Sequence, residues 1–381
     1  MSTVDEVGIG MVGTAFMGAA HSQAWRTVGR VFDLPVRPRM VAVCGRDEAR
    51  TAAAADRLGW SSYETDWRAL IARDDVQLVD VCTPGDSHAE IAIAALRAGK
   101  HVLCEKPLAN TVAEAEAMAA AAREAGTVAM TGFTYRRVPA LALMAEMVAA
   151  GRIGDVRHVR AAYLQDWLVD PASPLTWRLQ AEHAGSGALG DLGAHIVDAT
   201  RYLTGLEFTA VSALTETFVT ERPTGDGGTG AVTVDDTALF LARLSGGAVG
   251  TFEATRYATG RKNGLRIELN GTRGTLAFDL ERLNELEFHD GTRPQAEAGF
   301  TRILVTEPIH PYLSAWWPPG HLLGYEHAFT HQARDLLTAI AAGADDSAAR
   351  PAHASFDDGL AVQRVLDAVA SSAADGTWTT L

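Results

Sequence analysis

The chain has 381 residues, 47% of them hydrophobic and 21% charged, which is typical of a soluble globular protein with two domains. A formal net charge of -14, without runs of Lys and Arg interleaved with aromatic residues, argues against nucleic acid as a partner. Acidic residues stand near the start, where a secretory signal would be positive, and no apolar run is long enough to span a bilayer. We therefore expect a cytoplasmic protein with no membrane contact.

The first third of the chain alternates short apolar runs with alanine-rich helical stretches. Continuous apolar strands between helices favour a parallel sheet covered on both faces, the doubly wound Rossmann arrangement, over residues 1–136. The expected strands are 7–12, 40–44, 78–82, 101–104 and 128–132, and the expected helices start at 16 and cover 47–58, 88–98 and 112–125. Cys44, Cys82 and Cys104 each fall at the end of such a run, so we expect buried small hydrophobes and no redox or metal role.

The second part, residues 137–381, has a different pattern of predicted elements. Strands recur with turn signals between them and without intervening helices, which predicts a C-terminal α/β domain on a large, open, mostly antiparallel sheet. The expected strands are 156–164, 208–217, 237–244, 248–255, 265–269, 275–278 and 285–289. A helix at 189–203 interrupts them, and helices at 325–342 and 356–370 end the chain, free to pack back on the first domain. The glycine-rich stretch 223–230 is expected to be a mobile surface loop.

A glycine-rich turn follows the first strand. The literal G-x-G-x-x-G at Gly8, Gly10 and Gly13 lies within the strand, so we reject it as a phosphate site. The useful turn is the G-x-A-x-x-G variant from Gly13 to Gly18, which opens a helix whose free N–H groups attract pyrophosphate. By itself the turn leaves dinucleotide binding and a plain strand-turn-helix equally open.

The end of the second strand is expected to contact the adenosine ribose. There the chain has Gly45, Arg46 and Asp47. Arg46 suits a 2′-phosphate or stacking on adenine, whereas a carboxylate favours a free 2′-OH. Asp47 is equally well explained as the N-cap of the next helix. NAD and NADP both remain open as cofactors.

Two separated segments carry the residue types for proton movement. Glu105, Lys106 and Pro107 follow an apolar strand, so Lys106 is expected at a strand's carboxyl end, where its ammonium stabilises an alkoxide. Asp191 and His195 are one helical turn apart, and His195 is expected to take the hydroxyl proton as the hydride leaves carbon. The alternatives are a solvent-facing lysine, and a solvated polar helix face with Asp191 as its cap.

Aromatic and polar residues near the second segment suit a sugar, because an aromatic face packs on C–H groups while charged groups bind hydroxyls. About half of this set is expected to be core or sheet surface instead. The candidate substrate residues are Tyr135, Arg136, Tyr163, Asp166, Trp167, Trp177, Asp191 and His195. His327 and His331 have helical spacing for metal ligands but no H-E-x-x-H pattern, so no metal is predicted.

With these motifs in order, the chain resembles the Gfo/Idh/MocA family, which includes glucose-fructose oxidoreductase and inositol dehydrogenases. The resemblance covers nearly the whole chain, and Trp167, Trp177 and Arg178 are similar to levoglucosan dehydrogenase-type sugar dehydrogenases. It implies a Rossmann domain and a sheet domain that commonly serves oligomerisation. It also implies Lys106 and His195 at the reacting carbon, with Asp191 positioning the substrate or the histidine. The cofactor residues expected from the turn and the resemblance are Gly13, Ala15, Phe16, Met17, Gly45, Arg46, Thr83, Pro84, His88, Glu105, Lys106 and Arg178.

The resulting hypothesis is an NAD(P)-dependent oxidoreductase acting on a secondary hydroxyl of a cyclic sugar, anhydrosugar, glycoside or inositol. A homodimer or homotetramer is expected, because the sheet has apolar residues at alternate positions and no obvious helices for its outer face. The alternatives are a non-catalytic dinucleotide or sugar sensor of the same fold, and a glycoside-cleaving enzyme that keeps its NAD tightly bound. The lack of an acidic residue where Gly45 and Arg46 stand departs from NAD-linked relatives.

Overall fold

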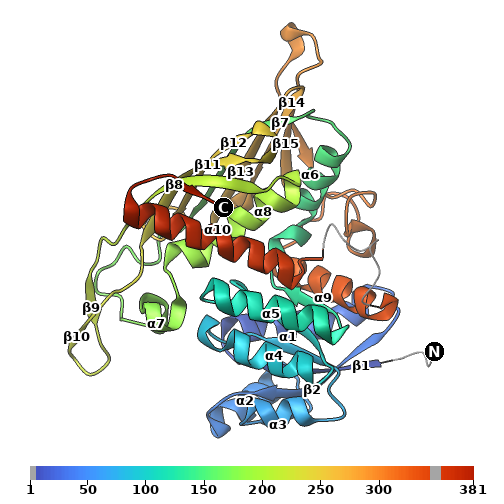
Figure 1. Cartoon of the computed structure of the whole chain (residues 1–381). Coiled ribbons are helices and arrows are strands. Elements are labelled where there is room, and N and C mark those ends of the chain that lie inside the picture. The colour runs from blue at the N-terminus through green and yellow to red at the C-terminus, as the bar shows by residue number, and fades with distance from the viewer. Residues whose placement is uncertain (1–5, 344–352) are drawn as a thin grey trace. The chain divides into compact units, whose positions relative to one another are not determined.

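The computed structural model describes residues 6–343 and 353–381 (Figure 1). Its contacts define two compact units, each described by itself below. The first unit is Met1–Arg137 with Gly324–Leu360, and the second is Val138–Leu323 with Ala361–Leu381. The assignment of cofactor binding to residues 1–136 and substrate binding to 137–381 stays a prediction. The acidic start of the chain, which argued against a secretory signal, includes residues 1–5, and these lie outside the described residues.

The first unit is built on a six-stranded parallel sheet with the order β3-β2-β1-β4-β5-β6. This is the order of a doubly wound nucleotide-binding fold, in which the order of the strands reverses between β1 and β4. The strands are β1 (Glu6–Val12), β2 (Arg37–Cys44), β3 (Ser62–Glu64), β4 (Leu78–Val81), β5 (His101–Cys104) and β6 (Ala129–Thr131). The helices are α1 (Phe16–Val31), α2 (Glu48–Leu58), α3 (Trp67–Ala72), α4 (His88–Arg97), α5 (Val112–Ala125) and α9 (Tyr325–Ala342).

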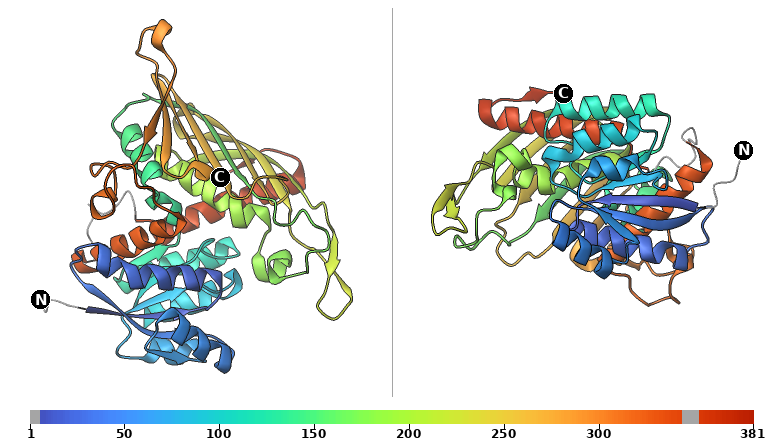
Figure 2. Two further views of the ribbon diagram at one scale, coloured as in Figure 1. Left: turned by 180° about the vertical axis from the view of Figure 1, so that it is seen from behind. Right: turned by 90° about the horizontal axis from the view of Figure 1, so that it is seen from below.

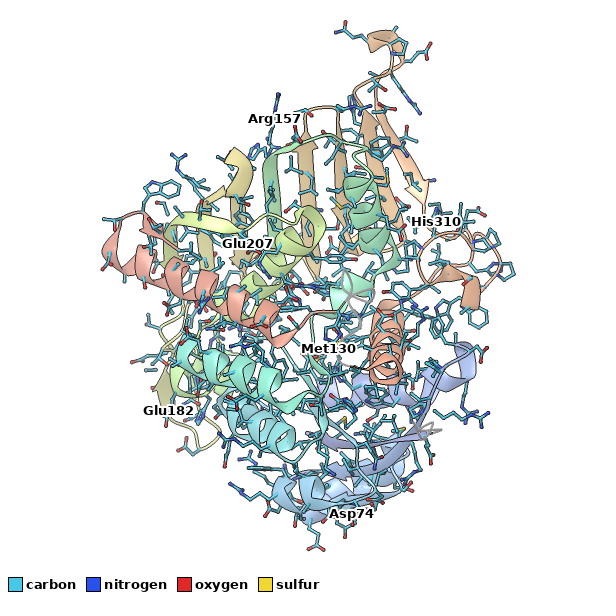
Figure 3. All side chains as sticks on the ribbon, turned by 45° about the vertical axis from the view of Figure 1, so that its right-hand side comes forward. Asp74, Met130, Arg157, Glu182, Glu207 and His310 are labelled. Atoms are coloured by element: carbon cyan, nitrogen blue, oxygen red, sulfur yellow. The ribbon has the colours of Figure 1, made fainter. Side chains whose placement is uncertain are left out.

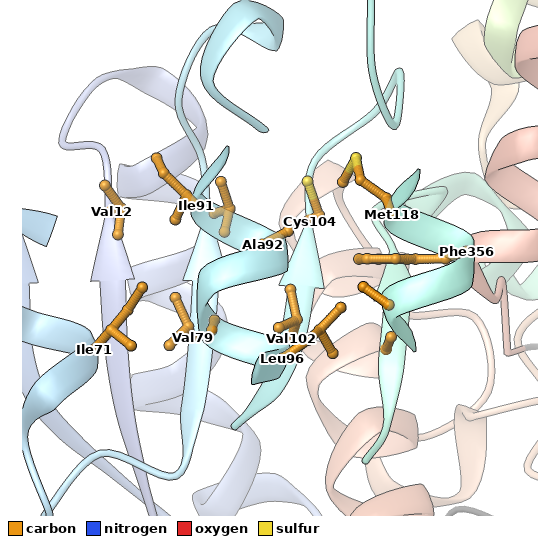
Figure 4. Packing of buried hydrophobic residues seen from close by; sticks show 14 of the residues in the cluster. Val12, Ile71, Val79, Ile91, Ala92, Leu96, Val102, Cys104, Met118 and Phe356 are labelled. Atoms are coloured by element: carbon orange, nitrogen blue, oxygen red, sulfur yellow. The ribbon is translucent and has the colours of Figure 1, made fainter. Parts of the chain in front are cut away.

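Two apolar clusters cover the two faces of this sheet. One combines strand residues with α3, α4 and α5, and Phe356 at the start of α10 (Phe356–Asp375) packs into it (Figure 4). The other combines strand residues with α1, α2 and α9, and includes Met130 of β6, which is labelled in Figure 3. The expected helices on both faces are therefore confirmed. All three cysteines are buried, as predicted, and none forms a disulfide.

The second unit contains a nine-stranded sheet with the order β16-β15-β14-β13-β7-β12-β11-β8-β17. Within this sheet β7 and β12 pair in parallel, and every other neighbouring pair is antiparallel. The strands are β7 (Val156–Leu164), β8 (Phe208–Glu216), β11 (Thr237–Leu244), β12 (Val249–Thr255), β13 (Gly264–Gly271), β14 (Gly274–Asp279), β15 (Glu285–Asp290), β16 (Phe300–Leu304) and β17 (Thr379–Thr380). The long strands of this sheet run from green to orange in Figure 2.

Helices of the second unit pack on one face of the sheet. They include α6 (Pro139–Ala149), α8 (Ala194–Thr204) and the part of α10 after residue 360, while the short α7 (Ala181–Ala184) lies in the segment before α8 (Figure 1). Helix α6, which precedes β7, was not predicted from the sequence. The expected loop at 223–230 is instead the turn of a two-stranded hairpin of β9 (Glu221–Pro223) and β10 (Thr229–Ala231).

In the described part of the chain, every helix is too short or too polar to cross a bilayer.

Candidate functional site

The glycine turn has the shape that a dinucleotide needs. Gly13 follows β1 with φ +113°, and a Cβ there would lie 2.6 Å from the Cys82 carbonyl oxygen. A Cβ on Gly18 would lie 2.2 Å from the Gly13 carbonyl oxygen, so both positions require glycine. Ala15 begins α1 without a side-chain cap, which leaves the first N–H groups of the helix available to a phosphate. These features fit a nicotinamide dinucleotide.

Two side chains of the turn lie beside this helix start. Phe16 is 65% exposed, and its ring stacks with Tyr325 of α9 at 6.5 Å between centroids. Met17 is half-buried and belongs to the rim of the apolar cluster under α1. Phe16 is thus an exposed aromatic face at the start of the helix, which supports its expected contact with a cofactor.

At the end of β2, the capping interpretation of Asp47 is confirmed. Its carboxylate accepts a hydrogen bond from the Arg50 N–H at 2.9 Å and begins α2. Arg46 is exposed, and a Cβ on Gly45 would meet the Thr51 hydroxyl at 2.6 Å. The carboxylate at this strand end is therefore engaged by the helix it caps.

The segment after β4 contains the expected residues Thr83, Pro84 and His88. Thr83 Oγ1 accepts a hydrogen bond from Ser87 at 2.7 Å. The buried His88 ring lies between two carbonyl oxygens, that of Thr83 at 2.9 Å and that of Pro107 at 3.0 Å. His88 therefore ties the loop after β4 to the loop after β5. Its expected contact with the cofactor stays a prediction.

Glu105 and Lys106 follow β5, as predicted. Glu105 is buried, Lys106 is half-buried, and the peptide bond to Pro107 is cis. Glu105 Oε1 lies 3.0 Å from His21 Nε2, and Oε2 accepts a hydrogen bond from the Lys106 N–H at 3.2 Å. Lys106 thus stands at the carboxyl end of a central strand, where doubly wound sheets bind their ligands.

The remaining candidates of the first unit are Tyr135 and Arg136, in a short 3-10 turn after β6. Tyr135 is buried, and its ring lies 6.3 Å from that of Tyr325. Arg136 is also buried, with Nη2 3.6 Å from the Asp358 carboxylate at the start of α10. Arg136 therefore contacts the start of α10, and its expected role as a substrate ligand stays a prediction.

In the second unit, the segment before α8 differs from the prediction. The expected continuous helix 189–203 begins with a π-helical turn, Leu189–Gly193, and only then becomes α8. Asp191 lies in that turn, so the α-helical spacing used to relate it to His195 does not apply there. Such turns are frequent at functional sites because they change the direction of a side chain.

Asp191 has a strong partner that the sequence did not reveal. Its carboxylate lies 3.0 Å from Nη2 of Arg256, which follows β12 and is 1% exposed. The same guanidinium donates to the Gly187 carbonyl at 3.1 Å and lies 5.3 Å from the Trp167 ring. Arg256 therefore fixes Asp191 and the loop before the π-helical turn together.

A second carboxylate, Asp235, supports the same turn. It accepts hydrogen bonds from the N–H groups of Gly187 at 2.7 Å and Leu189 at 2.8 Å. Burial raises the pKa of Asp235, while these N–H groups and Arg256 act in the opposite direction. A Cβ on Gly187 would lie 1.7 Å from the Asp235 carbonyl oxygen, so this position admits only glycine.

His195 packs against Tyr163 of β7, with ring centroids 5.6 Å apart in an edge-on arrangement. The Tyr163 hydroxyl donates to Oδ1 of Asn263 at 2.7 Å, and the Gln165 amide donates to the same oxygen at 2.8 Å. Trp167, 41% exposed, donates its indole N–H to Gln165 at 2.9 Å. The structure thus brings His195, Tyr163 and Trp167 into one network centred on Asn263.

The other candidates of the second unit lie nearby in sequence. Asp166 pairs with Lys262 at 2.7 Å, and this hydrogen bond holds the pKa of the carboxyl below its usual range. Arg178 lies over the Trp177 ring at 4.4 Å. Both aromatic residues, Trp167 and Trp177, therefore carry a guanidinium on one face.

His327 and His331, for which no metal was predicted, both lie on α9. His331 is buried, with Nδ1 2.9 Å from the Arg137 carbonyl oxygen, and burial lowers its pKa to about 3. His327 Nδ1 accepts a hydrogen bond from the Gly324 N–H at the start of the helix. Both rings thus contact backbone atoms, His327 at the start of α9 and His331 in the turn after β6.

Comparison with known proteins agrees with this geometry. Residues 7–133 match the oxidoreductase family with an NAD-binding Rossmann fold, and residues 141–277 match the GFO/IDH/MocA C-terminal domain. Levoglucosan dehydrogenase from Pseudarthrobacter phenanthrenivorans is 41% identical over 98% of this chain and 98% of its own. The chain belongs to the Gfo/Idh/MocA family.

Solved structures of similar proteins support the fold of this family member along its whole length. An oxidoreductase domain protein from Kribbella flavida is 64% identical, with a TM-score of 0.95 over 98% of this chain and 99% of its own. Levoglucosan dehydrogenase in complex with NADH and levoglucosan is 41% identical, with a TM-score of 0.94 over 99% of both chains. The predicted family, fold class, oxidoreductase activity and nicotinamide cofactor are confirmed.

Sequence reasoning missed several supporting residues. They are Arg256 and Asn263, which contact candidate side chains, Asp235, which holds the turn around Asp191, and Asp80, which contacts His21 beside Glu105. Asp80 had a usable signal, because a carboxylate in the middle of the apolar strand β4 requires a buried partner. Arg256 and Asn263 gave none, because they lie 65 and 100 residues from the side chains that they bind.

Proposed function

We propose that this protein oxidises a secondary hydroxyl of a cyclic sugar, anhydrosugar, glycoside or inositol to a ketone, or runs the reverse reduction, with NAD or NADP. The main support is Lys106 at the carboxyl end of β5, in the same parallel sheet as the strand that carries the glycine turn. Levoglucosan is the first candidate substrate, because the similar protein from Pseudarthrobacter phenanthrenivorans is a levoglucosan dehydrogenase.

The nicotinamide, when bound, supplies the hydride acceptor. The residues proposed to hold the dinucleotide are the uncapped start of α1, the exposed ring of Phe16 and the ends of β2 and β4. Lys106 donates a hydrogen bond to the reacting hydroxyl and stabilises the negative charge that develops on its oxygen. The proposal needs no metal, because an ammonium supplies this charge stabilisation.

His195 is proposed as the base that takes the hydroxyl proton. The contact of its ring with Tyr163 supports this role, because it limits the orientation of the imidazole. Asp191 is proposed to orient the hydroxyl or the imidazole, with its carboxylate fixed by Arg256. The exposed ring of Trp167 and the polar network at Asn263 supply the mixed apolar and polar surface that a sugar ring requires.

The test is a panel of anhydrosugars, aldoses, glycosides and inositols, assayed with NAD and with NADP at the nicotinamide absorbance band. We expect reduction of the cofactor with at least one cyclic polyol, levoglucosan first. A cofactor that raises the melting temperature without ever being reduced would support the sensor alternative and contradict the proposal. Turnover of a glycoside with nicotinamide that stays bound and shows no net reduction would support the glycoside-cleaving alternative and contradict the proposal.

We also propose that the protein forms a homodimer or homotetramer through the outer face of its nine-stranded sheet. Three leucines on adjacent strands point out of that face: Leu214, Leu239 and Leu241 are 58%, 39% and 51% exposed. They line a shallow pocket with a volume of about 750 Å³. Charged residues of both signs, such as Arg160 and Glu253, also line it. Exposed leucines on a concave sheet favour a self-complementary interface.

Sedimentation of the purified chain at micromolar concentration tests the assembly. The expected result is a dimer or tetramer, which Leu241→Glu shifts toward monomer because it places a charge in the apolar patch. The matched control is Arg97→Glu, which introduces the same side chain at an exposed position of α4 in the first unit and is expected to leave the assembly unchanged. A monomer for the unmodified chain would contradict the proposal.

A cytoplasmic location is proposed on the basis of the three unpaired cysteines, which fit a reducing compartment. Cell fractionation with an antibody to the protein tests it, and recovery in a membrane or secreted fraction would contradict it.

A further inference from the structure

A histidine of the first unit lies between two carboxylates. His21 is on α1 and is 2% exposed. Its Nδ1 lies 3.0 Å from both carboxylate oxygens of Asp80 on β4, and its Nε2 lies 3.0 Å from Oε1 of Glu105 after β5. Trp25, one turn further along α1, donates its indole N–H to Asp80 at 2.7 Å. Each of these contacts of the imidazole is therefore with a hydrogen-bond acceptor.

This geometry requires two protons on or beside the ring. A neutral imidazole carries one N–H, so its other nitrogen would present a lone pair to a carboxylate oxygen. Two buried carboxylates with one imidazolium between them leave one net negative charge, whereas a neutral ring would leave two. The ionised histidine is the arrangement with the lower electrostatic cost.

The titratable groups that surround the ring favour the same state. Burial by itself lowers the pKa of His21, but Asp80 and Cys82 together outweigh it, and the pKa is raised well above the usual 6.5. Burial also raises the pKa values of the Cys82 thiol and the Tyr325 hydroxyl, so both are neutral near pH 7. Five titratable groups face the ring or its partners. They are Asp80 on β4, Cys82 just after β4, Glu105 just after β5, Tyr135 in the turn after β6, and Tyr325 on α9.

The second oxygen of Glu105 connects this cluster to the candidate lysine. Glu105 Oε2 accepts the Lys106 N–H, while Oε1 faces the imidazole. A Cβ on Gly132 would lie 2.7 Å from Glu105 Oε1, so the backbone after β6 closes the other side of the carboxylate. The Glu105 side chain is thus held from three directions, and its hydrogen bond fixes the backbone from which the Lys106 side chain departs.

We propose that Asp80, His21 and Glu105 form a buried relay of charges that positions Lys106, with His21 an imidazolium at neutral pH. The relay rests on the proposed function, because Lys106 must act on the substrate for its position to affect turnover. Its members are positioning residues, since their polar atoms bind one another, Trp25 and the backbone of Lys106. Their effect is expected in turnover more than in cofactor affinity.

A divalent cation is the competing occupant of this cluster. His21, Asp80 and Cys82 offer ligand atoms within 4.8 Å of one another. A metal requires a neutral imidazole and a deprotonated thiol. Here the ring nitrogens lie at hydrogen-bond distance from carboxylate oxygens on both sides, and the pKa of the thiol is raised. Protons therefore account for the contacts without a metal.

The first test is NMR of the full chain with isotope-labelled histidine, near neutral pH. We expect one ring with both nitrogens protonated, whose signal disappears in His21→Gln and changes to the neutral form in Glu105→Gln, because an amide can donate to Nε2. His331, equally buried but facing one carbonyl, serves as the internal control and is expected to be neutral. A neutral His21 ring in the unmodified chain, or bound zinc at one equivalent, would overturn the proposal.

The second test is kinetic, with NADH affinity measured separately by fluorescence. Glu105→Gln and His21→Gln are each expected to lower kcat by about 10- to 100-fold, with the dissociation constant of NADH changed by less than about threefold. The double variant is expected to lose no more than the worse single variant, because both act through one relay. His331→Gln is the matched control, expected to lower the melting temperature while kcat stays within about twofold.

The two tests separate the relay from the proposed function. If Lys106→Met leaves turnover unchanged, the proposed function fails, while the protonation state of His21 still reports on the relay. If Lys106→Met abolishes turnover but both relay variants keep their kcat, or lose only stability as His331→Gln does, the relay is wrong and the function stands. If His21→Gln does not fold, Glu105→Gln alone decides by the same criteria.

Discussion

The two units hold their candidate catalytic side chains by different means. In the first, Lys106 follows a buried cluster of charges, His21 with Asp80 and Glu105, packed under the ends of parallel strands. In the second, His195 lies against Tyr163, whose hydroxyl joins a network of neutral amides at Asn263. A buried charge cluster tolerates little change, whereas a half-exposed amide network can be rearranged by single substitutions. We therefore expect substitutions that change a charge in the first unit to lower activity or stability strongly. Substitutions in the amide network of the second unit are expected to change substrate preference.

The largest expected effect comes from removing the ammonium of the first unit. Lys106→Met is expected to lower kcat by about 10²- to 10³-fold, because charge on the reacting oxygen loses its donor. NADH affinity, measured by fluorescence, is expected to change by less than about threefold. The matched control is Arg97→Met, an exposed cation on α4, expected to keep full turnover. Equal turnover of the two variants would remove Lys106 from the mechanism.

The next largest effect is expected on stability, from the removal of Arg256, a buried cation that contacts Asp191 in the second unit. Arg256→Met leaves Asp191 without its ion pair and the Gly187 carbonyl without its donor. We expect a loss of about 2 to 3 kcal/mol in the free energy of unfolding, below the range for fully buried pairs because Asp191 is partly exposed. Urea denaturation measures this loss. Arg266→Met, which breaks a surface pair with Asp279, is the control and should lose less than about 1 kcal/mol.

Two buried histidines of the first unit give a smaller, pH-dependent contrast. Burial lowers the pKa of His331 from 6.5 to about 3, so below pH 6.5 the unfolded chain binds a proton that the folded chain does not. His331 therefore destabilises the fold as the pH falls from 6.5 toward 3, by about 1.4 kcal/mol per pH unit. The stability advantage of the unmodified chain over His331→Gln should shrink at that rate over this range.

His21 should behave in the opposite way. Its pKa is raised in the folded state, so its contribution to stability is complete below pH 6.5 and is lost as the pH rises toward the raised value. The advantage of the unmodified chain over His21→Gln should therefore shrink on the alkaline side. Parallel stability curves for the two variants would mean that the two histidines do not differ in charge.

Much of the first unit could be predicted because its signals are local. The glycine turn, the apolar strands and the alanine-rich helices follow one another within short windows, and α5 begins and ends where the pattern indicated. The three-residue β3 and the six-residue α3 were missed because such short elements contain no full period. The capping role of Asp47 was one of two interpretations, and only its hydrogen bond from the Arg50 N–H distinguishes them.

The second unit was less predictable, since its important features depend on distant residues. The π-helical turn at Asp191 is compatible with the same apolar spacing as an α-helix, so the pattern could not distinguish them. Arg256 and Asn263 come from strand ends far along the chain and carry no motif. The same reason applies to His21 and Asp80, which are 59 residues apart. Candidate reacting residues were thus within reach of sequence reasoning, while most of their supporting partners were not.

The most direct test of the central proposal, that Lys106 and His195 act on the same hydroxyl, is a double-mutant cycle on kcat with a sugar that the protein oxidises. The variants are Lys106→Met, His195→Asn and the combination, each with NADH affinity measured as a check on folding. We expect each single variant to lose about 10²-fold or more and the double variant to lose little beyond the worse single one, because both groups serve one proton transfer. Losses that multiply fully, or a single variant with unchanged kcat, would contradict the account.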